Sequence, residues 1–96
     1  MVYCIAFDIV SDKVRRHVTK LIKKTGLVRI QKSVFIGKSD SVSIKTLEKH
    51  LLALLHPHLD KLFIAPLDNL AFQQLTFLGI ALDKQLITRE VAVRFF

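Results

Sequence analysis

The first eight residues contain the stretch that most limits how this chain can fold. Residues Val2 to Asp8 read VYCIAFD, a mostly apolar run that ends on a carboxylate. Such a run is typical of a strand buried on both faces, and an acid at its carboxyl end lies where the strand leaves the core. Asp8 is therefore the first candidate for chemistry. The alternative is that Asp8 only caps the helix that follows the strand.

The length and composition favour association with a partner subunit. A chain of 96 residues makes one domain, which buries well under about 70% of its unfolded surface, and 51% of its residues are hydrophobic. No apolar run reaches the roughly 18 residues of a membrane span, and no signal-like segment begins the chain. The single cysteine, Cys4, excludes an internal disulfide and a multi-cysteine zinc site. We expect a cytoplasmic protein with no membrane partner.

A helix is expected directly after the first strand. Ser11 is a candidate N-cap and Gly26 supplies the stop. Four apolar residues recur between them at helical spacing: Val14, Val18, Leu21 and Ile22. Arg15 projects beside the edge of this stripe, so we expect it near the end of the strand that carries Asp8.

The next segments predict two strands, a helix and a further strand. Residues 27–31 and 33–36 have a period of two and break near Lys32, and without a Gly or Asn-Gly turn the break is either a hairpin turn or a kink. Residues 40–43 offer caps for a second helix over 44–55, which Pro57 ends. Residues 62–67 predict a strand in which Pro66 implies a sheet edge or a bulge.

The order strand, helix, two strands, helix, strand predicts a ferredoxin-like α+β sandwich with both helices on one face of an antiparallel sheet. Beyond it, residues 68–74 predict a turn or short helix, 75–80 a strand and 90–96 an extra C-terminal strand. We divide the chain into a ferredoxin-like domain, 1–82, and a tail, 83–96. Because Phe95 and Phe96 are costly to leave in water, we expect the tail to dock across a homodimer interface.

The basic residues are unevenly distributed. Fifteen Lys and Arg face eight Asp and Glu, for a net charge of +7. Nine of the basic residues lie between positions 13 and 38, where no acid occurs: Lys13, Arg15, Arg16, Lys20, Lys23, Lys24, Arg29, Lys32 and Lys38. This asymmetry indicates a polyanionic partner, and the alternative is a solvated helix face.

Several short motifs resemble the CRISPR-associated protein two family. They are Phe7-Asp8-Ile9, then Ser11-Asp12-Lys13 with Arg15-Arg16, then residues 23–27 and above all 29–37, RIQKSVFIG. The resemblance is close over about the first forty residues and looser over the second helix and Ala65-Pro66-Leu67. It implies a ferredoxin-like homodimer whose C-terminal strand pairs onto the partner's sheet. It also implies that Asp8 faces its twin across the dimer axis as the catalytic residue and magnesium ligand.

The resemblance leaves two functions open. It implies a CRISPR adaptation protein, a homodimer that bridges integrase subunits and holds duplex DNA during spacer acquisition. It equally implies a magnesium-dependent endonuclease, usually on single-stranded RNA and in some members on double-stranded DNA. The basic stretch supports both a non-catalytic DNA-binding scaffold and an enzyme. A small-molecule-binding regulatory domain of the same fold is disfavoured because no Gly-rich or polar ligand loop is evident.

Eight further residues join Asp8 as site candidates. The nucleic-acid-binding candidates are Arg15, Arg16, Lys20, Arg29 and Lys32, and the supporting candidates are Ser33, Phe35 and His17. Phe35 is either core or a stacking platform, and Ser33 is most simply a strand hydroxyl. Many family members have a further basic residue at the position of His17, which is mostly uncharged at neutral pH.

Metal binding by Asp8 depends on a dimer. One carboxylate is a poor magnesium site, because the ion prefers octahedral oxygen ligation. A two-fold axis would pair two Asp8 side chains, whose repulsion favours a divalent cation or a shared proton. Three histidines near the end of the second helix, His50, His56 and His58, lack further ligands apart from Asp60, and we expect solvated loop histidines there.

Overall fold

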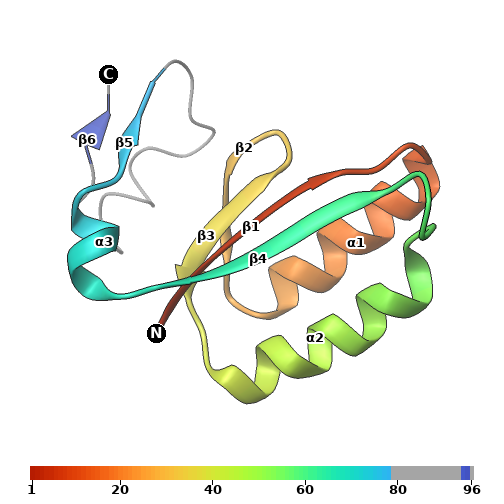
Figure 1. Cartoon of the computed structure of the whole chain (residues 1–96), viewed down its shortest axis with the longest axis horizontal. Coiled ribbons are helices and arrows are strands. Elements are labelled where there is room, and N and C mark those ends of the chain that lie inside the picture. Colours follow the sequence, from red (N-terminus) through yellow and green to blue (C-terminus); the bar gives the residue numbers. More distant parts are fainter. Residues whose placement is uncertain (79–93, 96) are drawn as a thin grey trace.

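Four strands of the described chain form one antiparallel sheet (Figure 1). The computed structural model describes residues 1–78 and 94–95. Its elements are β1 (Val2–Asp8), α1 (Asp12–Lys24), β2 (Val28–Gln31), β3 (Val34–Lys38), α2 (Ser41–Leu54), β4 (Lys61–Leu67), α3 (Asn69–Gln73), β5 (Thr76–Phe77) and β6 (Arg94–Phe95). The strand order across this sheet is β2-β3-β1-β4. The predicted ferredoxin-like βαββαβ fold of the α+β class is confirmed.

The two long helices cover one face of the sheet (Figure 1). Alternate residues of β1, including Ile5 and Phe7, are buried on this face with Val18 and Ile22 of α1 and with Leu47 of α2. A second buried cluster lies on the face turned away from α1 and α2, which we call the open face. The sheet is therefore buried on its helical side. Only the parts of the open face that no other element covers can bind a partner.

Only part of the open face is covered by the described chain. Phe72 of α3 packs against Val2 and Ile36, where β1 begins. Toward the other end of β1, the cross-strand row of Val34, Ala6 and Phe63 is half-buried or exposed, and Phe63 is 58% exposed. On the side where β1 ends, the described residues thus leave an apolar half of the open face uncovered.

Helix α1 begins and ends at the residues that the sequence predicts. Ser11 Oγ accepts a hydrogen bond from the backbone N–H of Val14 at 3.3 Å and caps the helix. Gly26 has a φ of 94°, a left-handed conformation that glycine adopts without a Cβ clash. Val18 and Ile22 are buried under the sheet, which confirms the predicted apolar stripe.

The break near Lys32 is a hairpin turn rather than a kink. Strands β2 and β3 pair antiparallel, with Gln31 opposite Val34 and Lys32 and Ser33 between them. No described non-glycine residue has a positive φ, so this turn is not of the primed type that matches strand twist. A register shift between Arg29 and Gln31 leaves Ile30 unpaired, and such a bulge increases the local twist that the turn does not supply.

Strand β4 lies at the edge of the four-stranded sheet, as its proline predicts. Pro66 is opposite Tyr3 of β1, and its missing N–H faces the side without a neighbouring strand in this sheet. Asp40 caps α2, which ends at Leu54, ahead of Pro57. The segment predicted as a turn or short helix is the helix α3. None of the described helices is long and apolar enough to cross a membrane.

The C-terminal strand is described only at Arg94 and Phe95. There β6 pairs in parallel with β5 of the same chain, with Thr76 opposite Arg94 and Phe77 opposite Phe95. Residues 79–93 and 96 lie outside the described part, and with them most of the tail, 83–96, and of the strands predicted over 75–80 and 90–96. Pairing of the tail with a partner's sheet therefore stays a prediction.

Candidate nucleic-acid interface

Asp8 lies at the exposed end of β1, on the open face. Residues at alternate positions of β1 share a face, and the buried cluster of the open face includes Val2 and Cys4, which places Asp8 on the same side. Its cross-strand neighbour is Lys61 of β4. Within the described chain no hydrogen bond or ion pair engages the Asp8 carboxylate, and Ser11 rather than Asp8 caps α1. The carboxylate is free to bind a ligand.

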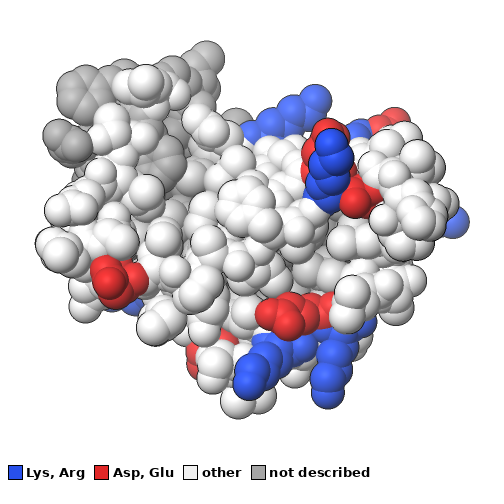
Figure 2. Space-filling model, in the orientation of Figure 1, with Lys and Arg blue, Asp and Glu red and all other residues white. Residues whose placement is uncertain are grey.

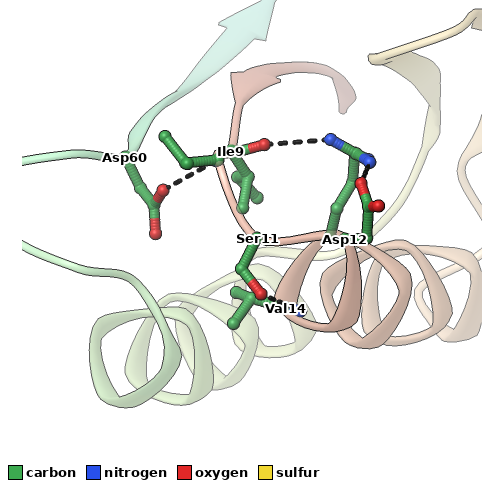
Figure 3. Close-up of polar contacts among 7 residues, drawn as sticks. Ile9, Ser11, Asp12, Val14 and Asp60 are labelled. Carbon is green, nitrogen blue, oxygen red and sulfur yellow. Dashed lines mark hydrogen bonds and ion pairs between the residues drawn. The ribbon is translucent and has the colours of Figure 1, made fainter.

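Asp60 holds the loop that follows Asp8 (Figure 3). Its Oδ1 accepts a hydrogen bond from Val10 N at 3.0 Å, and its Oδ2 accepts one from His56 N at 2.8 Å. The bonds from the backbone N–H groups of His56 and then Val10 lower the pKa of Asp60 below its ordinary value. From the sequence, Asp60 is expected only as a possible partner of the three histidines near the end of the second helix. No local sequence pattern indicates this role, because the contact joins residues 50 positions apart.

We expect Asp60→Asn to make the free energy of unfolding depend less on pH under acidic conditions. A carboxylate with a lowered folded pKa contributes stability above its unfolded pKa of about 3.9, and this contribution is lost as the pH falls through the folded value. Between roughly pH 4 and pH 2 the wild type should therefore lose more stability than the variant. Urea unfolding at a series of pH values measures this, and parallel curves would contradict it. The pKa of Asp40 is lowered by hydrogen bonds from the backbone and side chain of Ser43, so Asp40→Asn should show the same change with the same sign.

Arg15 lies beside the end of β1, as predicted. Its Nη1 donates a hydrogen bond to the backbone carbonyl of Ile9 at 3.0 Å, and its Nη2 pairs with Asp12 (Figure 3). The guanidinium thus fixes the first turn of α1 against the strand end. Two of its five N–H donors are used within the chain and its charge is paired with Asp12, so Arg15 offers less to a ligand than an unpaired cation.

The hairpin turn approaches the same end of β1. The backbone N–H of Phe7 donates to Ser33 O at 3.1 Å, which holds the turn against the strand. Lys32, in the turn, is exposed, and Ser33 is half-buried. The structure therefore brings Asp8, Arg15 and Lys32 to one end of the sheet, together with Lys61.

Arg29 and Phe35 form a separate unit within the helical face. Phe35 is 0% exposed, and its ring stacks on Phe7 with centroids 6.2 Å apart. Because it is completely buried in the described chain, Phe35 is core and offers no platform for a base. Phe35 can support the site only through Arg29. The Cζ of Arg29 lies 5.5 Å from the Phe35 ring centroid, within cation–π range.

The buried Nε of Arg29 makes no hydrogen bond. An unpaired buried donor costs about 1–3 kcal/mol. We therefore expect Arg29→Met, which keeps an unbranched stem against Phe35, to leave the free energy of unfolding measured with urea unchanged or to raise it by up to about 1 kcal/mol. Arg29→Ala, which removes the packing as well, should lower it. A large loss of stability in the methionine variant would show that the guanidinium itself stabilises the fold.

The outer surface of α1 carries the densest group of cations. A hollow of about 400 Å³ is lined by five basic or imidazole side chains and Leu21. We call it the α1 hollow, and its other lining residues are Lys13, Arg16, His17, Lys20 and Lys24. The predicted Arg16, His17 and Lys20 meet here, and Lys13 and Lys24, which were not among the candidates, join them. The ion pair between Arg15 and Asp12 uses none of these side chains.

The sequence candidates therefore separate into two surfaces. The α1 hollow faces away from the sheet, whereas Asp8 lies on the open face beyond the sheet. Arg29, on β2, belongs to neither group. Figure 2 shows that the side of the molecule along which β4 runs is mostly uncharged, with a few Asp and Glu on it and with most of the visible Lys and Arg toward its edges. The predicted nucleic-acid residues are thus not one contiguous cluster.

The histidines near the end of α2 make no metal site with Asp60. His58 N donates to His56 Nδ1 at 3.2 Å, and the rings of these residues lie 6.0 Å apart in an edge arrangement. Both carboxylate oxygens of Asp60 accept backbone N–H groups. Across the described residues no three His, Cys, Asp or Glu side chains are placed to hold a metal ion.

These features define a small, basic, ferredoxin-like α+β protein with an unpaired strand-end carboxylate. The family model for CRISPR associated protein Cas2 matches residues 1–75. The chain therefore belongs to the Cas2 family, which confirms the resemblance in its first forty residues.

Two named relatives and two solved structures are similar to the chain. A CRISPR-associated endoribonuclease Cas2 of Chloroflexus aurantiacus is 36% identical over 78 residues, which are 81% of this chain and 83% of that protein. One of Pyrobaculum aerophilum is 41% identical over 51 residues, 53% of this chain, so the match spans little more than half (56%) of that protein's length. A hypothetical protein of Thermus thermophilus superimposes with a TM-score of 0.71 at 31% identity, covering 83% of this chain and 92% of that one. Streptococcus pyogenes Cas2 shares the fold, with a TM-score of 0.64 at 23% identity, covering 71% and 87%.

Proposed function

We propose that the chain is a nucleic-acid-binding homodimer of CRISPR adaptation, which holds duplex DNA and bridges integrase subunits. The observation that carries this proposal is the α1 hollow, where exposed cations line one helix face without an acidic partner among them. Lys and Arg that neutralise phosphates release condensed counterions, and this drives sequence-independent binding. A polyanion is the partner that such a surface fits.

Removing two cations of the hollow tests the binding surface. We expect Arg16→Ala combined with Lys20→Ala to weaken duplex DNA binding about tenfold or more and to reduce the salt slope by about 1.8, at about 0.9 per phosphate contact. Fluorescence anisotropy at several salt concentrations measures both. The control is Lys45→Ala with Lys49→Ala, two exposed cations of α2 outside the hollow. Equal losses in the two double variants would contradict a localised surface.

The uncovered half of the open face supports the homodimer. Its apolar row, Val34, Ala6 and Phe63, ends beside Asp8, and a two-fold axis there would bury the row and pair the two carboxylates. The edge strand β4 offers unpaired backbone groups to the partner's C-terminal strand. In this arrangement the tail, 83–96, closes the dimer.

We expect Phe63→Asp to convert the dimer to monomers, because a charge would replace an aromatic ring in the buried interface. Sedimentation velocity measures the oligomeric state. Leu52→Asp is the control, since Leu52 is also exposed but lies on α2. If Phe63→Asp stays dimeric, the interface lies elsewhere. A chain that ends at Asp83 then tests whether the tail alone holds the dimer together.

A second proposal is a magnesium-dependent endoribonuclease site at the paired Asp8 residues. The observation favouring it is that Asp8 is exposed and unengaged, while Asp12 and Asp60 are occupied by Arg15 and by backbone N–H groups. The described part of one chain therefore supplies a single free carboxylate at this end, and two chains would supply the carboxylate pair that Mg²⁺ accepts. The names of the relatives, endoribonucleases, support the choice of RNA as substrate.

The residues around Asp8 fit a phosphodiester substrate. Bound magnesium would supply an activated water and would neutralise the negative charge that develops on the phosphate oxygens. Asp8 would hold the ion, and the exposed ammonium groups of Lys32 and Lys61 would attract the flanking phosphates. Arg15, on α1, holds the end of β1 in place through its hydrogen bond to the backbone carbonyl of Ile9.

A further inference from the structure

A groove between α1 and α2 lies next to the α1 hollow. Its volume is about 310 Å³, and it is lined at the end of α1 by Leu21, Lys24 and Thr25 and along α2 by residues that include Thr46 and His50. Leu21 and Lys24 line both the groove and the hollow, so the two depressions are adjacent. The side chains that line them in the described chain include no acid.

The donors in this groove suit one phosphate group. The hydroxyls of Ser43, Thr46 and Thr25 already donate, to Asp40, to the Val42 carbonyl and to the Ile22 carbonyl. Lys24 therefore supplies the ammonium group, and an N–H of the exposed His50 imidazole supplies a second donor.

The rest of the groove suits a sugar rather than a second charge. Leu21 and Leu47 form apolar lining, and Val42 at the rim is exposed. A ribose or deoxyribose ring presents carbon atoms that can pack on such a surface. A backbone segment, one phosphate with its sugar, matches this combination of two donors and an apolar wall.

We propose that the groove between α1 and α2 binds a sugar–phosphate unit of the same duplex DNA that the α1 hollow binds. This inference rests on the proposed nucleic-acid-binding function. From Lys13 to Lys24 the α1 hollow extends over eleven residue-to-residue steps, about 16 Å at about 1.5 Å per step, which spans roughly five base steps. The groove extends this path from α1 to α2.

One consequence is that the duplex lies on the helical layer. Asp8 is on the opposite side of the sheet, so a duplex held along this path does not occupy the Asp8 site. Binding through the groove and chemistry at Asp8 are therefore separable by mutation.

Substitutions in the groove test the proposal in the full-length protein. We expect Lys24→Gln to weaken binding of a fluorescein-labelled DNA duplex on the order of fivefold and to reduce the salt slope by about 0.9. His50→Phe, which keeps an aromatic ring but removes the N–H donor, should weaken binding about twofold to threefold with little change in slope. Lys45→Gln removes a charge from the same helix outside the groove and is the matched control.

The outcomes separate this inference from the proposed function. If the wild type binds no duplex, or if Arg16→Ala with Lys20→Ala has no effect, the proposed binding function itself is wrong. If that double variant weakens binding while Lys24→Gln and His50→Phe match Lys45→Gln, the hollow binds DNA and the groove does not. Thermal unfolding of each variant distinguishes lost contacts from lost structure.

Discussion

We expect Asp8→Asn to reduce magnesium-dependent RNA cleavage by about a thousandfold or more, because the amide removes the charge that holds the ion and nearly preserves the shape. The side chain is exposed and makes no hydrogen bond or ion pair within the described chain, so folding should be unaffected. Cleavage of a labelled single-stranded RNA with magnesium and with chelator measures the loss. Glu48→Gln, which removes an exposed acid of α2, is the control.

A second measurement makes the same substitution informative even without cleavage. Two Asp8 carboxylates near a two-fold axis repel in the absence of metal, so Asp8→Asn should tighten the dimer in chelator. Magnesium should strengthen the wild-type dimer and leave the variant unchanged. Sedimentation equilibrium with and without magnesium distinguishes these cases. Cleavage that survives the substitution, or a dimer equally sensitive to magnesium in both proteins, would exclude the paired site.

The fold was predictable from local patterns. The apolar run of β1, the cap at Ser11 and the proline of β4 each determine a local conformation, and the structure confirms all three. The hairpin near Lys32 was not predictable, because its turn lacks the glycine or asparagine of a primed turn. The bulge at Ile30, which supplies the twist that the turn lacks, depends on the pairing of β2 with β3. It therefore cannot be predicted from the sequence of either strand alone.

The candidate site was only partly predictable for a related reason. Asp8 and Arg15 were placed correctly, since strand and helix periodicity give their directions. Arg15 and Arg16 are neighbours in sequence but about 100° apart around the helix, so one supports the strand end and the other lines the hollow. Asp60 bonds to Val10 across 50 residues, a tertiary contact that no local pattern encodes. The groove shared by α1 and α2 was missed for the same reason.

We expect Phe35→Ala to be the most destabilising single substitution in the sheet, with a loss of about 3–5 kcal/mol in the free energy of unfolding. Phe35 is completely buried between Ile5, its cross-strand partner, and Arg29, and it stacks on Phe7. Truncation would leave a cavity at the junction of β1, β2 and β3. Urea unfolding at a fixed protein concentration measures the loss, because the stability of a dimer depends on concentration.

Phe63→Ala is the matched control for this core substitution. Both phenylalanines lie on strands that flank β1, but Phe63 is 58% exposed on the open face. For Phe63→Ala we expect a small loss in the stability of a single chain and a weaker dimer. Phe35→Ala should instead lower the free energy of unfolding at every protein concentration. If both variants lost stability equally and in the same concentration-dependent way, the open face would be as integral to each chain's core as the helical face. A single chain would then have no uncovered half to bring two Asp8 residues together.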